Sequence, residues 1–96
     1  MQIGSFRHKG LRQLYEDNNP KGVQASLVDK LRKQLLAMET ASSLDDLTVF
    51  PGWKLHPLKG NFAGSWSLSV SANWRLIFEY IEATNTAILL DLIDYH

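Results

Sequence analysis

Side chains that can exchange protons or stabilise negative charge occur at three places in the second half of the chain. His56 and Lys59 lie in the stretch Trp53-Lys54-Leu55-His56-Pro57-Leu58-Lys59-Gly60, Arg75 lies in an apolar segment, and Asp94-Tyr95-His96 follows another apolar run. Together they offer a guanidinium, an ammonium, two imidazoles, a phenol and a carboxylate. This set suits metal-free cleavage of RNA by its own 2′-hydroxyl, which requires a base, an acid, and cations beside the charge that builds on the phosphorane.

Each of these side chains also has an ordinary structural interpretation. Pro57 and Gly60 prevent a long regular element, so His56 lies on or beside a short turn and could be a buried histidine bonded to the backbone. Arg75 could form an ion pair with Glu79, because strand alternation places both side chains on the same face of the strand. The ring of the tyrosine at position 95 could cap the core, with its hydroxyl reaching water.

A metal site is a further alternative, because histidines and carboxylates bind zinc. The possible ligands are His8, His56, His96, Asp91 and Asp94. They do not have the spacing of an HExxH motif, and the chain contains neither a phosphate-binding glycine loop nor a GxSxG motif. We therefore expect no metal ligand and no cofactor.

The distribution of charge favours a polyanionic partner. The formal net charge is zero, but residues 1–33 carry seven Lys or Arg against three Asp or Glu. Residues 54–75 carry Lys54, Lys59 and Arg75 and no acid, and a segment of that kind is where a polyanion would bind. The simpler alternative is a solvated basic face with plain surface lysines.

Length and composition indicate one folded domain that comprises residues 1–96. The hydrophobic fraction is 45% and the charged fraction 21%, which is ordinary for a globular domain. There is no cysteine, which excludes disulfides, thiolate nucleophiles and cysteine zinc sites. The sequence has no signal peptide and no apolar run of about 18 residues that could span a membrane, so we expect a cytoplasmic protein.

The elements that must position these residues begin with a short strand at residues 2–4. A helix over residues 5–16 follows, with Ser5 as its N-cap, and Asp17-Asn18-Asn19-Pro20 ends it. Residues 23–41 form a second helix, because their apolar side chains make a stripe about 100° wide.

The second half of the sequence predicts a sheet. Residues 65–71 alternate strictly, which points the aliphatic and aromatic side chains to the core and four serines outward. Residues 74–80 alternate in the same way after a turn at Ala72-Asn73, so the two strands form an antiparallel hairpin. Residues 86–93 are nearly continuously apolar, as in a strand buried on both faces. The order of elements predicts an α+β domain, with two helices on one face of a curved, mainly antiparallel sheet of three to five strands.

Five segments, in this order, closely resemble the HigB-type bacterial toxins, also called plasmid maintenance system killer proteins, of the RelE-like superfamily. They are Phe6-Arg7-His8-Lys9-Gly10-Leu11, Leu55-His56-Pro57-Leu58-Lys59-Gly60, Gly64-Ser65-Trp66-Ser67, Asn73-Trp74-Arg75-Leu76-Ile77-Phe78 and Asp94-Tyr95-His96. The resemblance implies a RelE-like fold and a toxin that cuts translated mRNA on the ribosome without a metal. It also implies a helix-turn-helix antitoxin as partner.

The resemblance assigns roles to residues whose motifs match. The catalytic residues it implies are His56, Lys59, Arg75, Asp94, Tyr95 and His96. Contacts to RNA and the ribosome are expected from Lys9, Arg12, Lys30, Arg32, Lys33, Lys54 and Asn73. The alternative is a non-catalytic module of the same fold that binds the antitoxin or blocks the ribosome, and a nuclease that needs no ribosome is a third possibility.

Overall fold

A computed structural model describes residues 1–95 of the chain. Its five strands form one sheet in the order β1-β5-β4-β3-β2. The strands are β1 (Gln2–Ile3), β2 (His56–Pro57), β3 (Ser65–Ser69), β4 (Trp74–Ile81) and β5 (Thr86–Asp94). β1 runs parallel to β5, and all other neighbours are antiparallel, which confirms the predicted α+β fold and the hairpin.

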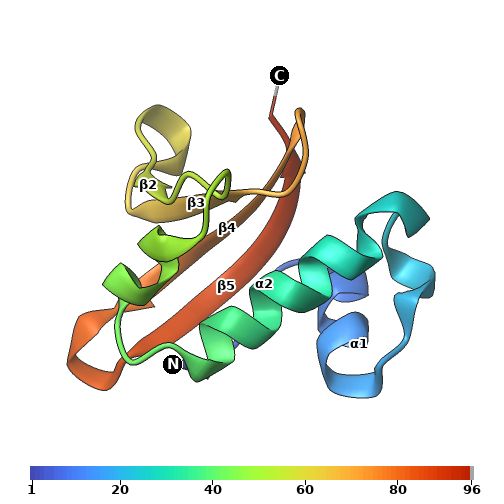
Figure 1. The fold of residues 1–96 in the computed structure, drawn as a ribbon, viewed down its shortest axis with the longest axis horizontal. Coiled ribbons are helices and arrows are strands. Elements are labelled where there is room, and N and C mark those ends of the chain that lie inside the picture. The colour runs from blue at the N-terminus through green and yellow to red at the C-terminus, as the bar shows by residue number, and fades with distance from the viewer. Residues whose placement is uncertain (96) are drawn as a thin grey trace.

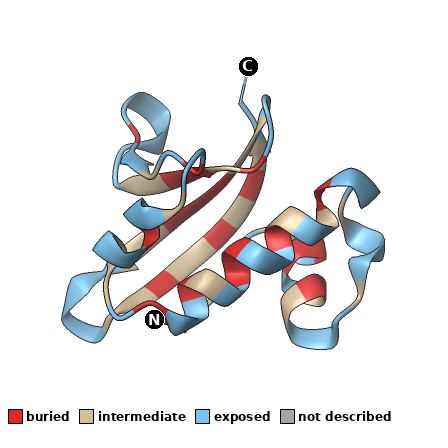
Figure 2. Cartoon of the chain, in the orientation of Figure 1, coloured by how far each residue is buried: buried red, intermediate tan, exposed pale blue. Residues whose placement is uncertain are grey.

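The two helices, α1 (Lys9–Asp17) and α2 (Val28–Thr40), supply the other half of the core. α2 lies across the sheet with α1 beside it, and the buried residues of α2 form the stripe that the sequence predicts (Figures 1 and 2). Leu31 and Met38 from α2 meet Phe78 from β4 in one cluster, and each of these side chains is at most 1% exposed. Within residues 1–95, no helix is both long enough and apolar enough to cross a membrane.

The predicted starts of both helices are wrong. α1 begins at Lys9, and its cap is His8, whose Nδ1 accepts a hydrogen bond of 2.9 Å from the backbone N–H of Leu11. Ser5 instead accepts a 3.0 Å bond from the N–H of Leu89, because the chain leaving β1 continues alongside β5. α2 begins later than predicted because two short 3₁₀ turns occupy most of residues 20–27.

Two glycines allow the segment after α1 to fold back against the start of that helix. A Cβ on Gly10 would lie 2.1 Å from the carbonyl oxygen of Gly22, and a Cβ on Gly22 would lie 2.5 Å from the Cα of Gly10. Real Cβ atoms do not approach backbone so closely. Glycine is therefore required at both positions because there is no room for a side chain, and not because the backbone takes an unusual φ angle.

The sheet face opposite the helices is less open than the alternation predicts. Ser67, one of the four serines expected to face solvent, is fully buried. The cause is the segment between β2 and β3, which folds over this face and carries the buried Leu58. Ile77, the β4 partner of Ser67, is only 5% exposed for the same reason.

A β-bulge in β5 shapes the same face. The pairing of β4 with β5 shifts between Ile77 and Glu79, so β5 has one more residue there than its partner. Leu89 takes up the extra length with a φ of 56°, a left-handed conformation that costs a bulky residue roughly 1–2 kcal/mol. Bulges bend a strand and re-aim side chains. Here Ile88 and Leu89 are consecutive partly exposed residues between the fully buried Ala87 and Leu90.

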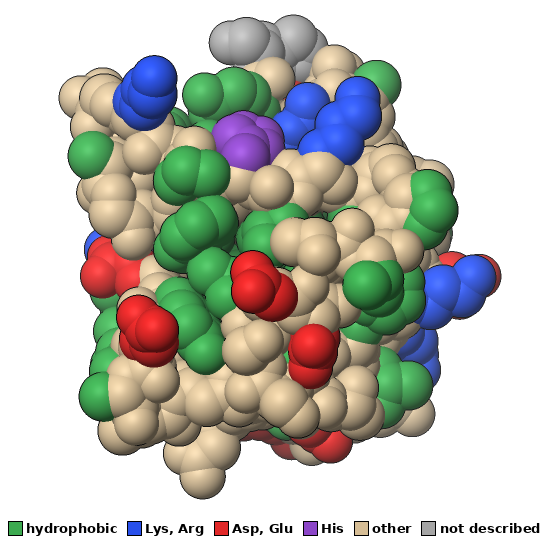
Figure 3. All heavy atoms as spheres, turned by 60° about the vertical axis from the view of Figure 1, so that its left-hand side comes forward, with side chains coloured by type: hydrophobic (Ala, Val, Ile, Leu, Met, Phe, Trp, Pro, Cys, Tyr) green, Lys and Arg blue, Asp and Glu red, His purple; other side chains and the backbone are tan. Residues whose placement is uncertain are grey.

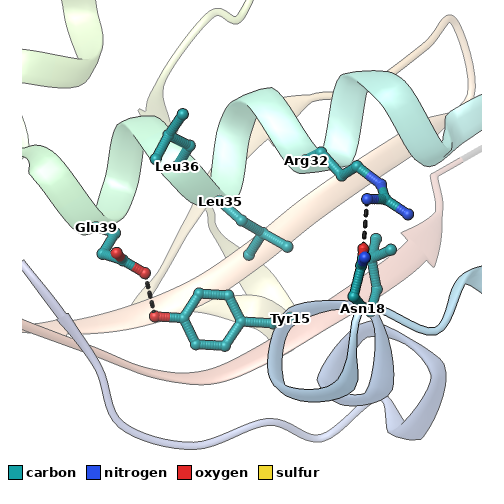
Figure 4. A pocket seen from close by; sticks show the side chains of 7 residues that line it. Tyr15, Asn18, Arg32, Leu35, Leu36 and Glu39 are labelled. Atoms are coloured by element: carbon teal, nitrogen blue, oxygen red, sulfur yellow. Dashed lines mark hydrogen bonds between the residues drawn. The ribbon is translucent and has the colours of Figure 1, made fainter.

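The two helices are also linked by polar contacts at their surface groove (Figure 4). The hydroxyl of Tyr15 donates a 2.5 Å hydrogen bond to the carboxylate of Glu39, and Arg32 donates to the side-chain oxygen of Asn18. The hydrogen bond to Glu39, with burial and the nearby carboxylate charges, raises the pKa of Tyr15 from 10.0 to about 12.

We expect this bond to stabilise the protein only while Tyr15 is protonated. Because the folded pKa is the higher one, the contribution is complete below pH 10 and is lost as the pH rises towards 12. Tyr15→Phe should lower the free energy of unfolding by about 1 kcal/mol near neutral pH. Urea titrations of both proteins across this range should show the difference shrinking. A difference that stays constant with pH would contradict the assignment.

Candidate functional site

Three cations surround one hollow at the turn end of the β3–β4 hairpin. Its volume is about 350 Å³, and Lys30, Lys54 and Arg75 line it together with backbone and small side chains. Among residues 1–95, no carboxylate contributes to its lining. Three positive charges converge there from α2, from the loop before β2 and from β4, so the hollow favours an anionic ligand.

Arg75 is held in place by the backbone of the hairpin turn. Its Nη1 donates hydrogen bonds to the carbonyl oxygens of Ser71 at 2.8 Å, Ala72 at 3.2 Å and Trp74 at 3.1 Å. The pairing with Glu79 that the sequence allowed is not formed, since the one ion pair within residues 1–95 joins Arg12 and Glu16. The guanidinium is therefore positioned by neutral backbone carbonyls of the hairpin turn.

The end of β5 lies beside Arg75. Tyr95 donates its backbone N–H to the carbonyl oxygen of Asn73 at 2.7 Å, which continues the β4–β5 pairing beyond Trp74 and Asp94. The guanidinium carbon of Arg75 lies 5.9 Å from the centre of the Tyr95 ring, within the range of a cation–π contact. The tyrosine is 45% exposed, so it does not cap the core.

Phe62, which was not among the residues predicted for the site, lies beside Tyr95. Its ring centre lies 6.4 Å from that of Tyr95, with the planes tilted by 54°. Phe62 lies in a short turn, Gly60–Phe62, and 37% of its surface is exposed. Gly60 and Gly64 on either side of it have positive φ angles, so the loop can fold back towards the sheet. The only sequence signal was an aromatic residue between two glycines.

His56 and Lys59 lie on the other side of β3. His56 begins β2 and is exposed, and its Nδ1 lies 2.7 Å from the carbonyl oxygen of Lys54, so it is bonded to backbone but is not the buried turn histidine that the sequence allowed. The register pairs His56 with Ser67 and Arg75 with Ser69, which places both on the sheet face away from the helices. Strand spacings put their Cα atoms about 12 Å apart, a gap that two long side chains can span around one phosphodiester. Lys59 is exposed where the short Gly60–Phe62 turn begins.

A buried polar contact brings Lys30 from the helix layer to the hollow. Gln34 is fully buried, and its Nε2 donates a 2.8 Å hydrogen bond to the carbonyl oxygen of Ser69 on β3. Lys30 is one helical turn before Gln34 and therefore lies on the same side of α2. Its ammonium also lies 6.0 Å from the centre of the Trp53 ring, at the outer range of a cation–π contact.

The other predicted cations do not reach this hollow. Arg32 lines the groove between the helices, bonded to Asn18, and Arg12 pairs with Glu16 on α1. Lys9 and Lys33 are exposed on α1 and α2. The structure thus brings Lys30, Lys54, Arg75, Asn73 and Tyr95 together, and it leaves these four cations on the helical side. His96 lies outside the described residues.

Basic side chains gather at one end of the face that Figure 3 presents. A histidine and several Lys or Arg side chains gather in its upper part, Asp and Glu side chains lie across its middle and lower part, and further Lys or Arg side chains lie at the right edge (Figure 3). Among residues 1–95, no three His, Asp or Glu side chains come close enough together to form a metal site. The ligand set considered from the sequence is thus not assembled by the described histidines and aspartates.

Comparison with known families matches nearly the whole chain to one model. Residues 4–96 match the model described as the RelE-like toxin of the type II toxin–antitoxin system HigB. The chain is 44% identical over 94 residues to Endoribonuclease HigB of Proteus vulgaris, covering 98% of this chain and 99% of that protein. It is 31% identical over 87 residues to Toxin HigB-1 of Vibrio cholerae serotype O1, covering 90% and 92% of the two chains.

Solved structures support the fold. The YoeB–YefM toxin–antitoxin heterotetramer of Staphylococcus aureus contains a similar chain, with a TM-score of 0.58, 19% identity and coverage of 100% and 99%. YafQ of E. coli gives a TM-score of 0.57 at 15% identity, with coverage of 97% and 93%. At these identities the likeness extends to the architecture alone.

Proposed function

Because the chain belongs to the HigB-like, RelE-family toxins of type II toxin–antitoxin systems, we propose that it is a ribosome-dependent endoribonuclease that cleaves translated mRNA and so inhibits translation. The observation that carries the proposal is the hollow lined by Lys30, Lys54 and Arg75, whose described lining residues include no carboxylate and which lies against Tyr95 and Asn73. The endoribonuclease named among the relatives covers almost the whole of this chain.

In the proposed reaction the 2′-hydroxyl attacks the neighbouring phosphorus, and the 5′-oxygen of the next nucleotide leaves. The pentacovalent phosphorane carries additional negative charge, which Arg75 and Lys59 stabilise. Because Nη1 of Arg75 is bonded to the hairpin carbonyls, the guanidinium is already held in place, and its remaining N–H groups can donate to the substrate. A donor already in position for the developing charge contributes roughly 10²–10³-fold in rate.

Proton transfer needs one group to accept the 2′-hydroxyl proton and one to protonate the leaving oxygen. His56 and His96 are the imidazoles available, and each such transfer is worth roughly 10²–10⁴-fold. Asp94 orients an imidazole or accepts a proton, and Tyr95 stacks on a base or shares in proton transfer. The reaction as written requires no cofactor.

The remaining cations hold the RNA backbone. Lys30, Lys54 and Asn73 border Arg75 and contact the mRNA, whereas the helix cations contact ribosomal RNA. The helix set is Lys9, Arg12, Arg32 and Lys33. Contacts to phosphates supply affinity without sequence information, so ribosome binding should weaken steeply as salt is raised.

The partner that silences the toxin is an antitoxin, and we propose that it is a helix-turn-helix protein acting with this chain in the cytoplasm. The family model describes a toxin–antitoxin system, and a chain of similar fold was solved bound to its antitoxin. A short reading frame for a helix-turn-helix protein beside this gene would support the pairing.

The decisive experiment incubates the protein with ribosomes that are translating a defined mRNA and maps the new 5′ ends. We expect cuts in phase with codons, and little cleavage of the same mRNA without ribosomes, because the ribosome orients the substrate. No cuts, together with a block in translation, would favour the non-catalytic alternative. Equal cleavage of free mRNA would indicate a nuclease that needs no ribosome.

A further inference from the structure

A second pocket lies on the same sheet face as Arg75, further along β4 and β5. Its volume is about 140 Å³, close to the roughly 150 Å³ of a protein cavity that holds one benzene ring. The pocket is lined by Phe62, Ile77 and Leu89 and by polar side chains that include Glu79, Asp91 and Arg7. Of these residues only Phe62 also borders the cleavage site described above, through its contact with the ring of Tyr95.

The apolar lining is suited to a flat ring. Ile77 is 5% exposed, and Leu89 takes the left-handed conformation of the bulge while lining the pocket. Phe62 borders the pocket and also contacts the ring of Tyr95, so one aromatic side chain connects the pocket to the cleavage site. Aromatic side chains in single-stranded RNA sites stack on bases.

The polar side chains that line the pocket favour a base whose edge donates hydrogen bonds. Carboxylates accept hydrogen bonds, and Oδ1 of Asp91 already accepts one of 2.9 Å from the backbone N–H of Leu92. Its other oxygen and the carboxylate of Glu79 therefore remain as acceptors for a ligand in the pocket. An exocyclic amino group, as on cytosine, adenine or guanine, matches these acceptors, whereas uracil has none. Arg7 supplies a cation at the rim for the phosphate of that nucleotide.

The distance along the strand suits a neighbouring nucleotide. Ile77 is two residues from Arg75 on the same face, which is about 7 Å along β4. We propose that this pocket receives one unstacked base next to the cut and selects a base with an exocyclic amino group. This inference rests on the proposed cleavage of mRNA. Phe62 is the stacking residue, and Glu79 and Asp91 determine the base preference.

The test maps cuts by the wild-type protein and by variants in ribosome-bound mRNAs whose codons differ one base at a time. The wild type should disfavour uracil at one codon position. The double variant Glu79→Gln with Asp91→Asn should lose that discrimination by roughly 5–150-fold, the range of a good base contact. Phe62→Ala should slow cleavage at all codons by roughly 5–150-fold, whereas Phe62→Tyr should keep the rate.

Val49→Ala is the matched control, because Val49 is 71% exposed and lies outside both sites. Its cleavage pattern and rate should equal those of the wild type. If the wild type cuts mRNA but the double variant keeps the base preference and Phe62→Ala keeps the rate, the pocket assignment is wrong and the proposed function stands. If the wild type cuts nothing, the proposed function itself fails.

Discussion

Replacing Arg75 with alanine should lower the rate of mRNA cleavage on ribosomes by roughly 10²–10³-fold and abolish growth arrest when the protein is expressed. Hydrogen bonds to the carbonyls of Ser71, Ala72 and Trp74 hold the guanidinium in place at the hollow. Alanine removes both the positive charge and the fixed position of its hydrogen-bond donors, so a neighbouring lysine cannot take over the role of the guanidinium.

The conservative change separates charge from geometry. Arg75→Lys keeps a positive charge, but a lysine ammonium lacks the planar fork that can bond the hairpin carbonyls and a phosphate at once. We expect Arg75→Lys to remain at least tenfold below the wild type. Lys21→Ala is the control for loss of one cation, because Lys21 is exposed and has no proposed contact with RNA. Cleavage rates come from single-turnover reactions, and circular dichroism checks the fold. A fully toxic Arg75→Ala would contradict the role proposed for this residue.

Replacing Gly10 with alanine should destabilise the protein by about 3 kcal/mol or more, the upper range for overpacking. In an ordinary helix the same change stabilises by about 1 kcal/mol, because alanine has the higher helix propensity. The two effects therefore have opposite signs, and the contact with Gly22 decides between them. The new Cβ would lie 2.1 Å from a backbone oxygen, and backbone cannot rotate away as the end of a side chain can.

Urea unfolding of Gly10→Ala measures this effect directly. Lys9→Ala serves as the stability control, because Lys9 is the adjacent exposed residue of α1 and alanine should change its stability by less than about 0.5 kcal/mol. Gly22→Ala should be destabilising too, since its Cβ would lie 2.5 Å from the Cα of Gly10. A Gly10→Ala protein as stable as the wild type would mean that the segment after α1 does not pack against the helix in this way.

Several features of this protein were predictable from the sequence because they depend on neighbours along the chain. Alternation over residues 65–80 is a property of each strand, and it correctly predicted the hairpin that carries Arg75. The helical stripe of α2 was equally local, and its buried residues are Leu31, Leu35 and Met38 together with Gln34. The segment without acids, residues 54–75, supplies two of the three cations of the hollow, Lys54 and Arg75.

Other features depend on residues that meet only after the chain has folded. Alternation assigns Ser67 to solvent, yet the segment after β2 buries it. No pattern within β3 could predict that a distant segment covers this face. Ser5 is a good N-cap by type, but the pairing of Phe6 with Leu90 delays the helix to Lys9. In both cases a distant segment competes successfully with a local preference.

The site, too, combines residues that the sequence identified with contacts that only the folded chain creates. The sequence identified Arg75 and Tyr95 as reactive types, and the register of β4 with β5 decided that they touch. Lys30 lines the hollow where α2 is bonded through Gln34 to the end of β3, and Phe62 contacts Tyr95 from the segment between β2 and β3. Residue types and local periodicity are determined by adjacent residues. Which side chains share a pocket is determined by strand register and by loops that cross the sheet, and these are set by the free energy of the whole fold.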